Sequence, residues 1–315
     1  MRWLTVILLL LATFLIAAAQ YVDFKDTVVQ VYTKMEVAIE TLQSTEIVII
    51  VNGQEVERKK EEFYGIQETI EVWVLGSGFI VWSDTNPYTK ERETLIMTNY
   101  HVIAYIVNPP ESLTEITNDE TITVGVYKNG KLERLEKPAN FYRFKIKSVD
   151  GPYLLFYRAF KKSKKLLFEV KAEVDKYDTL LDVAVLKLKN VTGLPRVRFA
   201  NSIDDYDVGT EILIFGAPLG IPFQLTKGIL GQKHLDAGDG WNDMIRYDCP
   251  QAPGSSGSAI FEFLTKKVIG MVRGSYVTTF GSPYDGQHLG ISVDNIKDWL
   301  FYNGYQFILE GGEME

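Results

Sequence analysis

Three short segments of this sequence carry side chains suited to nucleophilic catalysis. The first holds His101, one of only three histidines in the 315 residues, and the second holds Asp182 at the start of an apolar run. The third, Pro253 to Ile260, places two adjacent serines between glycines. A serine hydroxyl is a poor nucleophile until an imidazole accepts its proton, and a carboxylate must hold the imidazole in the right tautomer. Together the segments supply the residue types of a Ser-His-Asp triad.

Each segment taken singly also has an ordinary structural interpretation. A histidine that follows a strand is often structural, an aspartate before an apolar strand often caps a turn, and a Gly-Ser-Ser-Gly-Ser stretch suits a flexible turn. The catalytic interpretation therefore depends on the occurrence of all three segments in one chain.

Composition excludes several other classes of function. Acidic residues outnumber basic ones by 41 to 33, so the net charge of −8 leaves no excess of cations for phosphate neutralisation and argues against nucleic acid as a partner. The single cysteine, Cys249, excludes an intrachain disulfide and a multi-thiolate zinc site, and we interpret it as a small buried apolar residue. We expect no metal and no cofactor.

The N-terminus has the layout of a targeting segment. Arg2 precedes an uncharged stretch from Trp3 to Ala19 that ends in three alanines. Residues 1–19 are interpreted as a signal peptide cleaved after Ala19 or, if uncleaved, as a membrane anchor through residues 3–19. Both alternatives place the remaining chain outside the cytoplasm, in the periplasm or secreted.

The rest of the chain is rich in strand-forming residues. Apolar residues spaced by three and four predict an amphipathic helix from Asp26 to Leu42, and residues 294–302 predict a second helix near the C-terminus. Between them, β-branched and aromatic runs alternate with turn signals such as Asn129-Gly130 and Asp150-Gly151. This pattern predicts hairpin-built barrels or a sandwich.

Five landmarks in this sequence resemble the chymotrypsin-fold serine proteases, and most closely their HtrA/Deg branch. The resemblance extends over roughly residues 76 to 300. The landmarks are Gly76-Ser77-Gly78-Phe79, Thr98-Asn99-Tyr100-His101-Val102, Asp182-Val183-Ala184-Val185-Leu186-Lys187, Gly216-Ala217-Pro218-Leu219-Gly220 with Lys227-Gly228-Ile229, and Pro253-Gly254-Ser255-Ser256-Gly257-Ser258.

The resemblance implies an all-β fold of two six-stranded antiparallel β-barrels, to which we add the N-terminal and C-terminal helices. The expected divisions are a leader over 1–19, an N-terminal helix and first strand over 20–65, the protease domain over 66–303 and a short tail over 304–315. The implied triad is His101 as general base, Asp182 as its orienting carboxylate and Ser256 as nucleophile. The chain order His, Asp, Ser fits chymotrypsin and excludes the order of the α/β-hydrolases.

The serine loop also implies an oxyanion hole, formed by backbone N–H groups of the residues Gly254, Ser255 and Ser256. Ser255 is an alternative nucleophile, but we favour Ser256 because it precedes Gly257 as the family's serine precedes its glycine. The loop departs from the family pattern, since Ser255 stands where asparagine is usual and Ser258-Ala259 replace glycine and proline. The separation between His101 and Asp182 is also longer than usual, which indicates an inserted hairpin.

Specificity residues are implied by position alone. We expect the substrate-binding wall to include Pro250 and Gln251, just before the serine, and Met271, Val272 and Arg273 on a later strand. Because proline stands where a trypsin-like enzyme has aspartate, we expect a small or medium apolar P1 side chain rather than arginine or lysine.

The predicted function is an extracytoplasmic serine endopeptidase that cleaves unfolded or exposed polypeptides. A catalytically inactive fold that serves as a binding or scaffold module is the alternative, and an esterase or peptide-transfer enzyme would share the same acyl-enzyme chemistry. The residues after the last predicted helix are too few for the PDZ domain that usually follows an HtrA-type protease. The oligomeric state stays open, although the family's habit is a homotrimer.

Overall fold

The computed structural model describes residues 24–51, 54–110, 121–128, 131–138, 142–159, 164–221, 224–236, 243–277 and 283–310. The predicted leader over residues 1–19 lies outside the described residues. Within those residues, no helix has the length and apolar character needed to cross a membrane.

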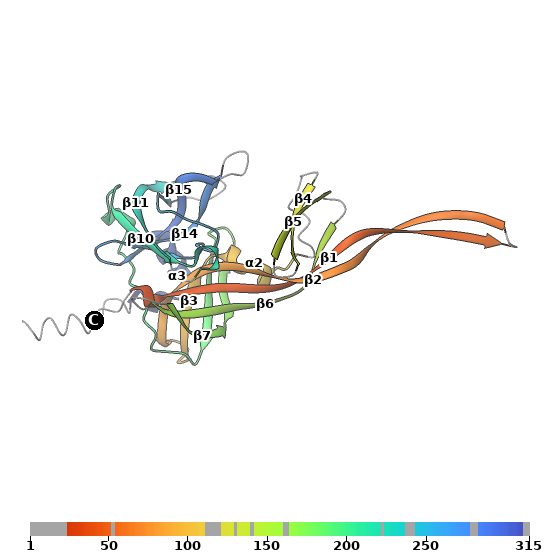
Figure 1. Cartoon of the computed structure of the whole chain (residues 1–315). Helices are drawn as coiled ribbons and strands as arrows, with labels where there is room; N and C mark the ends of the chain where they lie inside the picture. The colour runs from red at the N-terminus through yellow and green to blue at the C-terminus, as the bar shows by residue number, and fades with distance from the viewer. Residues whose placement is uncertain are drawn as a thin grey trace, which may run out of the picture. The chain divides into compact units, whose positions relative to one another are not determined.

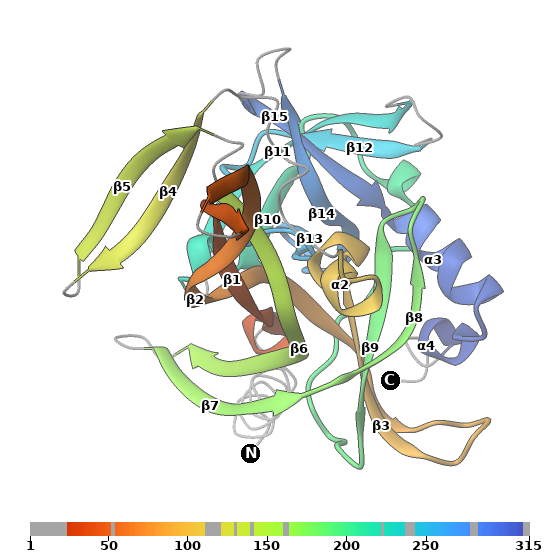
Figure 2. The ribbon, with the colours of Figure 1, turned by 90° about the vertical axis from the view of Figure 1, so that its right-hand side faces the viewer.

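Two β-sheets make up most of the fold, which confirms the predicted all-β class (Figures 1 and 2). The first has seven strands in the order β7-β6-β1-β2-β3-β9-β8, and the second is a closed barrel in the order β10-β11-β12-β15-β14-β13. The bounds in the first sheet are β1 Val28–Val51, β2 Gln54–Thr85, β3 Arg92–Thr98, β6 Tyr142–Ala159, β7 Lys164–Lys171, β8 Glu173–Asp178 and β9 Val183–Lys189. Those in the barrel are β10 Glu211–Gly216, β11 Gln224–Leu235, β12 Met244–Tyr247, β13 Ala259–Glu262, β14 Val268–Val277 and β15 Pro283–Ser292.

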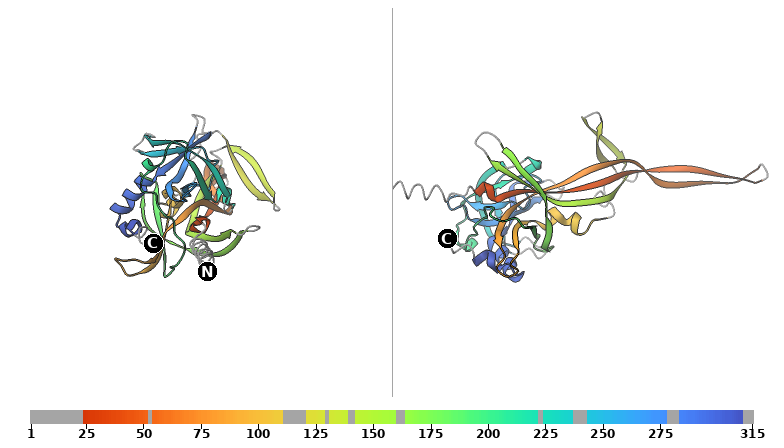
Figure 3. Two further views of the ribbon diagram at one scale, coloured as in Figure 1. Left: turned by 90° about the vertical axis from the view of Figure 1, so that its left-hand side faces the viewer. Right: turned by 90° about the horizontal axis from the view of Figure 1, so that it is seen from below.

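Short helices and one further hairpin complete the described chain. The α-helices are α2 Tyr100–Val107, α3 Val293–Tyr302 and α4 Gln306–Glu310, and the 3-10 helices are η1 Phe24–Thr27, η4 Ile203–Asp205 and η5 Pro218–Gly220. The strands β4 Thr121–Lys128 and β5 Lys131–Pro138 form a separate two-stranded sheet, visible in both views of Figure 3. The C-terminal helix is confirmed, while the expected tail over 304–315 contains α4 with buried Phe307 and Ile308.

The chain divides into two compact units. The first comprises Met1–Tyr32, Leu75–Ile103 and Pro152–Glu315, and the second comprises Thr33–Val74 and Ala104–Gly151. All three predicted triad residues belong to the first unit. The second unit contains most of the long ribbon of β1 and β2 together with the β4–β5 hairpin.

The predicted N-terminal helix over residues 26–42 is wrong, because this segment is the 3-10 helix η1 followed by β1. Apolar residues four apart share one face of a strand as well as of a helix, whereas those three apart lie on opposite strand faces, and the pattern fits β1 because both of its faces are buried. The segment is rich in β-branched residues such as Val29, Val31 and Val37, which favour a strand. Its residues from Val28 to Thr33 are all buried, as in a strand covered on both faces.

The predicted insertion between His101 and Asp182 is only partly a hairpin as expected. β4 and β5 pair from Lys128 and Lys131 outward, around the predicted Asn129-Gly130 turn, whose two residues lie outside the described ones. The turn expected at Asp150-Gly151 is wrong, because β6 continues through it as one strand. Gly151 has a φ of 136°, a conformation open to glycine, and this lets the strand pass without reversing.

The pairing of β3 with β9 brings the histidine segment to the aspartate segment. Thr98, the last residue of β3, lies opposite Ala184 in the antiparallel ladder. Because the strands are antiparallel, the residues after Thr98 come beside those that precede Val183. Both strands are mostly buried, and Leu95, Met97, Val183 and Val185 belong to a core that also includes residues of the barrel.

An ion-pair cluster fixes the same two strands. Lys187 Nζ of β9 lies 3.0 Å from Asp175 Oδ1 and 3.3 Å from Glu93 Oε2, and the Glu93 side chain is 1% exposed. Burial acts to lower the pKa of Lys187, but hydrogen bonds and charge attraction from Asp175 and Glu93 outweigh it and raise the pKa overall. Asn86 donates to Glu93 and the Tyr305 hydroxyl donates to Asp175, so the carboxylates are held on both sides.

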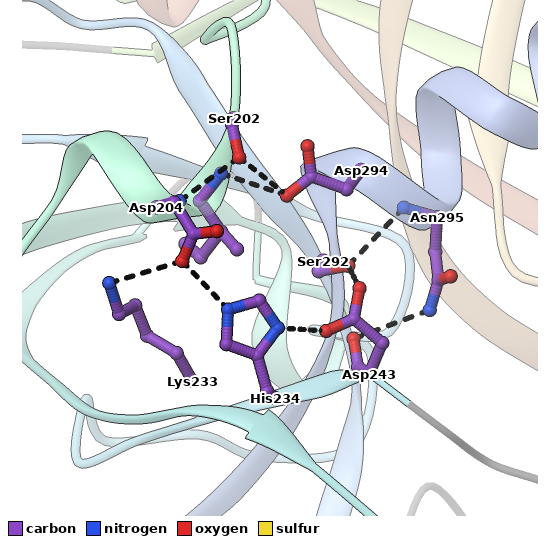
Figure 4. A network of polar contacts seen from close by, with 9 residues as sticks. Ser202, Asp204, Lys233, His234, Asp243, Ser292, Asp294 and Asn295 are labelled. Carbon is purple, nitrogen blue, oxygen red and sulfur yellow. Dashed lines mark hydrogen bonds and ion pairs between the residues drawn. The ribbon is translucent and has the colours of Figure 1, made fainter.

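A polar network ties the barrel to α3 (Figure 4). His234 Nε2 lies 2.8 Å from Asp204 Oδ1, and His234 Nδ1 contacts Asp243. Ser292, the N-cap of α3, donates to Asp243, and Asn295 donates to the Asp243 carbonyl. The hydrogen bonds to Asp204 and then Asp243 raise the pKa of His234, and His234 lowers the pKa of Asp204 in turn.

The Lys187 cluster predicts a large effect of a single substitution. Lys187→Met leaves Glu93 buried without its cation, so we expect the free energy of unfolding to fall by about 2–4 kcal/mol in urea denaturation. Lys189→Met removes a lysine from the same strand, whose partner Glu173 is exposed, and we expect little change. Equal losses in the two variants would contradict this account of the strand pair.

The His234 network predicts a pH-dependent contribution to stability. Because folding raises the pKa of His234, its stabilisation is complete below about pH 6.5 and is lost as the pH rises through the folded-state value. We expect His234→Gln to lower Tm by roughly 1–3 °C more at pH 6 than at pH 9. Lys233→Gln removes the other cation near Asp204, and its effect should be equal at the two pH values. A pH-independent effect of His234→Gln would contradict the assignment.

Candidate active site

His101 and Asp182 form a two-point contact. His101 Nδ1 lies 2.8 Å from Asp182 Oδ2, and the His101 backbone N–H donates to Asp182 Oδ1 at 2.9 Å. The Asp182 side chain is 6% exposed, whereas that of His101, in the first turn of α2, is 47% exposed. A buried carboxylate therefore holds one edge of an imidazole that remains open to solvent, as a general base requires.

The backbone around Asp182 is fixed by local hydrogen bonds. Asp182 adopts a φ of 62°, which aspartate tolerates better than most residues. Its carbonyl accepts hydrogen bonds from the Asn99 side chain at 2.9 Å and from the Tyr100 N–H at 3.2 Å. The preceding turn is capped by Asp178, whose carboxylate accepts from the two N–H groups at positions 180 and 181. These hydrogen bonds fix the backbone of Asp182 and thereby the direction in which its carboxylate points.

The serine loop is built on a β-turn. The Ser255 N–H donates to the Ala252 carbonyl at 3.0 Å, and Gly254 has a φ of 98°. Proline at the second position and glycine with positive φ at the third are the residues that a type II turn favours. The next glycine, Gly257, also has a positive φ, of 84°.

Ser77 holds this loop from the other sheet. Its hydroxyl donates to the Gly254 carbonyl at 2.8 Å and accepts from the Ala217 N–H at 3.0 Å, while its own N–H donates to the Ser256 carbonyl at 2.8 Å. A Cβ on Gly257 would lie 2.1 Å from the Ser77 carbonyl oxygen and 2.5 Å from Thr98 Oγ1. The serine loop therefore lies directly against the segment that leads to His101.

The structure treats the two adjacent serines differently. Ser255 is buried, its hydroxyl accepts from the Ala252 N–H at 3.4 Å, and its N–H is used in the turn. Ser256 is half-buried, and among the described residues its hydroxyl makes no hydrogen bond, including none to His101. His101 and Asp182 are thus joined, and Ser256 is brought to the same region on a loop.

Two backbone donors of this loop are unused. Within the described chain, the N–H groups of Gly254 and Ser256 have no backbone acceptor, whereas those of Ser255, Gly257 and Ser258 donate to carbonyls. Such paired free donors beside a nucleophile are the requirement for an oxyanion hole. Ser255, which we included in that predicted set, does not offer its N–H.

The predicted specificity residues fall into separate environments. Pro250 is exposed, while Gln251 has both amide atoms buried without a hydrogen-bond partner among the described residues. Met271 and Val272 are buried in the barrel core. The Arg273 side chain reaches Asp182, with Nε 3.5 Å from Oδ2. Of the five residues, Pro250 alone is exposed, and Met271 and Val272 are part of the core.

Other reactive groups of the first unit serve structural roles. Burial raises the pKa of Cys249 to about 12, so its thiol stays protonated near neutral pH. His288 is buried and pairs with the Ser275 hydroxyl at 2.7 Å, and His234 belongs to the network of Figure 4. Sequence reasoning did not assign Ser77 or Asn99 a role, although both lie within the family-like landmarks Gly76-Ser77-Gly78 and Thr98-Asn99.

Comparisons with known proteins give the same family. A model of the trypsin-like peptidase domain matches residues 76–271, more than half of the chain. A probable periplasmic serine endoprotease DegP-like of Halomonas elongata is 33% identical over 131 residues, which cover 41% of this chain and 27% of that protein. The protein of the same description from Rickettsia conorii is 27% identical over 202 residues, which cover 62% of this chain and 28% of that protein. The chain thus spans about a quarter of the length of these relatives.

Solved structures with a similar fold include two HtrA/Deg proteins. The HtrA-type protease AlgWS227A with decapeptide has a TM-score of 0.49 and 15% identity, over 89% of this chain and 64% of that one. Deg5 has a TM-score of 0.47 and 17% identity, over 90% of this chain and 92% of that one. Because the matched domain model extends over more than half of the residues, the conclusion is that this chain belongs to the trypsin-like peptidase family.

Proposed function

We propose that this protein is a serine endopeptidase that uses Ser256 as nucleophile, His101 as general base and Asp182 as the carboxylate that orients the imidazole. The observation that carries the proposal is the two-point contact between His101 and Asp182. It leaves Nε2 as the ring nitrogen that can accept a proton, and the serine loop approaches at Gly257, which lies against Thr98, three residues before His101.

The proposed reaction is acyl transfer in two steps. His101 takes the proton of the Ser256 hydroxyl as its oxygen attacks the peptide carbonyl, and the N–H groups of Gly254 and Ser256 bind the oxygen that becomes negative. The imidazolium then protonates the leaving amine, and a water molecule activated in the same way releases the acid. The missing hydrogen bond between Ser256 and His101 fits this scheme, because such contacts often tighten only when substrate binds.

The substrate and the cellular location that we propose are taken from the descriptions of similar proteins. The curated relatives are described as periplasmic endoproteases, and the AlgW structure was solved with a decapeptide. We propose exposed or unfolded polypeptide as the substrate and an extracytoplasmic location for this chain. A homotrimer, as the family's usual assembly, belongs to the same proposal.

The nucleophile is tested by cleavage of an unfolded protein such as casein by the chain from residue 20 onward. Ser256→Ala should lower the rate by at least about 10³-fold at unchanged Tm, because no other group can form the acyl-enzyme. Ser255→Ala, a change of the neighbouring hydroxyl, should cost less than about tenfold, since that group only accepts a weak hydrogen bond in the turn. Undiminished cleavage by Ser256→Ala would remove the proposal.

The general base is tested by the pH profile of the same cleavage. The imidazole must be neutral to accept the serine proton, so we expect kcat/KM to fall about tenfold per pH unit on the acid side of the imidazole's titration range. A rate that stays level from about pH 5 to 8 would show that no histidine acts as base.

A further inference from the structure

Arg273 and His101 meet at the same oxygen atom. Arg273 Nε lies 3.5 Å from Asp182 Oδ2, the atom that lies 2.8 Å from His101 Nδ1. The other carboxylate oxygen, Oδ1, accepts the His101 backbone N–H. The carboxylate of Asp182 therefore has histidine contacts on both oxygens and an arginine contact on the one that faces the imidazole.

An irregularity in β14 accompanies this contact. The ladder with β15 shifts register between Val272 and Gly274, so Arg273 is the extra residue of a bulge. Bulges next to active sites redirect a side chain out of the regular alternation of a strand. Val272, the residue before it, donates to the Ser258 carbonyl and accepts from the Gly257 N–H. One short stretch of β14 thus touches both the serine loop and the triad carboxylate.

The guanidinium is charged where it lies. The Arg273 side chain is 15% exposed. Burial lowers the pKa of Arg273 to about 10, and attraction by Asp182 acts in the opposite direction. It consequently remains a cation throughout the range in which an imidazole titrates.

We propose that Arg273 is a positioning residue of the site, which anchors the Asp182 carboxylate and, as a fixed positive charge beside it, disfavours the imidazolium form of His101. The proposal rests on the proposed function, in which His101 acts as base. It moves Arg273 from the specificity wall, where the sequence placed it, to the support of the triad.

The electrostatic consequence has a definite sign. A cation near an imidazole makes protonation harder, so Arg273 extends activity toward lower pH and weakens the pull of Asp182 on the imidazolium. The other ionisable groups on the surrounding elements are Tyr100 and Tyr177, whose rings stack 5.3 Å apart, and Asp178, which caps its own turn. In the described part of the chain, no side chain of these three makes a hydrogen bond or ion pair with His101 or Asp182, and Tyr100 meets Asp182 only through a main-chain hydrogen bond. Arg273 is therefore the cation that sets this balance.

The first test is the pH profile of casein cleavage by Arg273→Gln and Arg273→Met. Removal of the charge should move the midpoint of the acid limb of kcat/KM to higher pH by at least about 0.5. Arg273→Lys, which keeps a cation, should restore the wild-type midpoint in large part. Arg246→Gln is the matched control, because it removes an arginine of the same barrel that contacts Gln287 instead. Equal midpoints in Arg273→Gln, Arg273→Met and Arg246→Gln would overturn the proposal.

The second test separates this inference from the activity itself. The imidazole signals of the three histidines are titrated by NMR in the Ser256→Ala protein, with and without Arg273→Met, and His101 is assigned by loss of its signal in His101→Gln. We expect the His101 titration to move upward by at least about 0.5 pH while that of His234 stays in place. If His101 shifts in this way but the wild-type chain does not cleave casein, the Arg273 contact is supported and the protease function is rejected. An unmoved His101 in an active protease would reject the Arg273 proposal alone.

Discussion

The site depends on one interaction, in which the buried carboxylate of Asp182 accepts hydrogen bonds from both the backbone and the ring of His101. Asp182 reaches both His101 N–H and Nδ1 because β3 ends beside the start of β9. The buried cluster around Lys187 joins these strands, so the stability of the first sheet and the geometry of the site have a common origin. Without that strand pair, the two residues, which lie 81 positions apart, have no reason to meet.

The serine loop is held by a different set of forces. Its turn residues Pro253 and Gly254 set the backbone, while Ser77 and Val272 fix it from two sides through main-chain hydrogen bonds. Buried polar contacts of this kind leave the loop few alternative conformations, which keeps the proposed nucleophile and two free N–H donors in one place. In the proposed mechanism, the barrel therefore supplies the nucleophile and the first sheet supplies the base.

Much of this arrangement was predictable from sequence, for physical reasons that differ between parts. Turn-forming residues between β-branched and aromatic runs predicted the all-β class. Short motifs predicted the segments around His101, Asp182 and Ser256. The strand β1 was missed because it is buried on both faces, so its apolar residues also fall at the spacings of three and four that a helix face shows. The continuity of β6 through Gly151 was missed because a glycine permits both a turn and an extended passage.

Contacts between distant residues were beyond such reasoning. Nothing in the local sequence indicates that the Ser77 hydroxyl contacts the serine loop or that the Arg273 guanidinium contacts Asp182. These contacts depend on the register of the sheets and on the bulge in β14. A sequence pattern specifies what a strand is made of, but a one-residue bulge decides where one side chain points.

The most direct test of the account is covalent labelling with a fluorophosphonate, followed by mass spectrometry of the labelled peptide. The account predicts one phosphonyl group on Ser256, with labelling lost in His101→Gln and strongly slowed in Asp182→Asn. A label on Ser255, or equal labelling of Ser256 in His101→Gln, would contradict it.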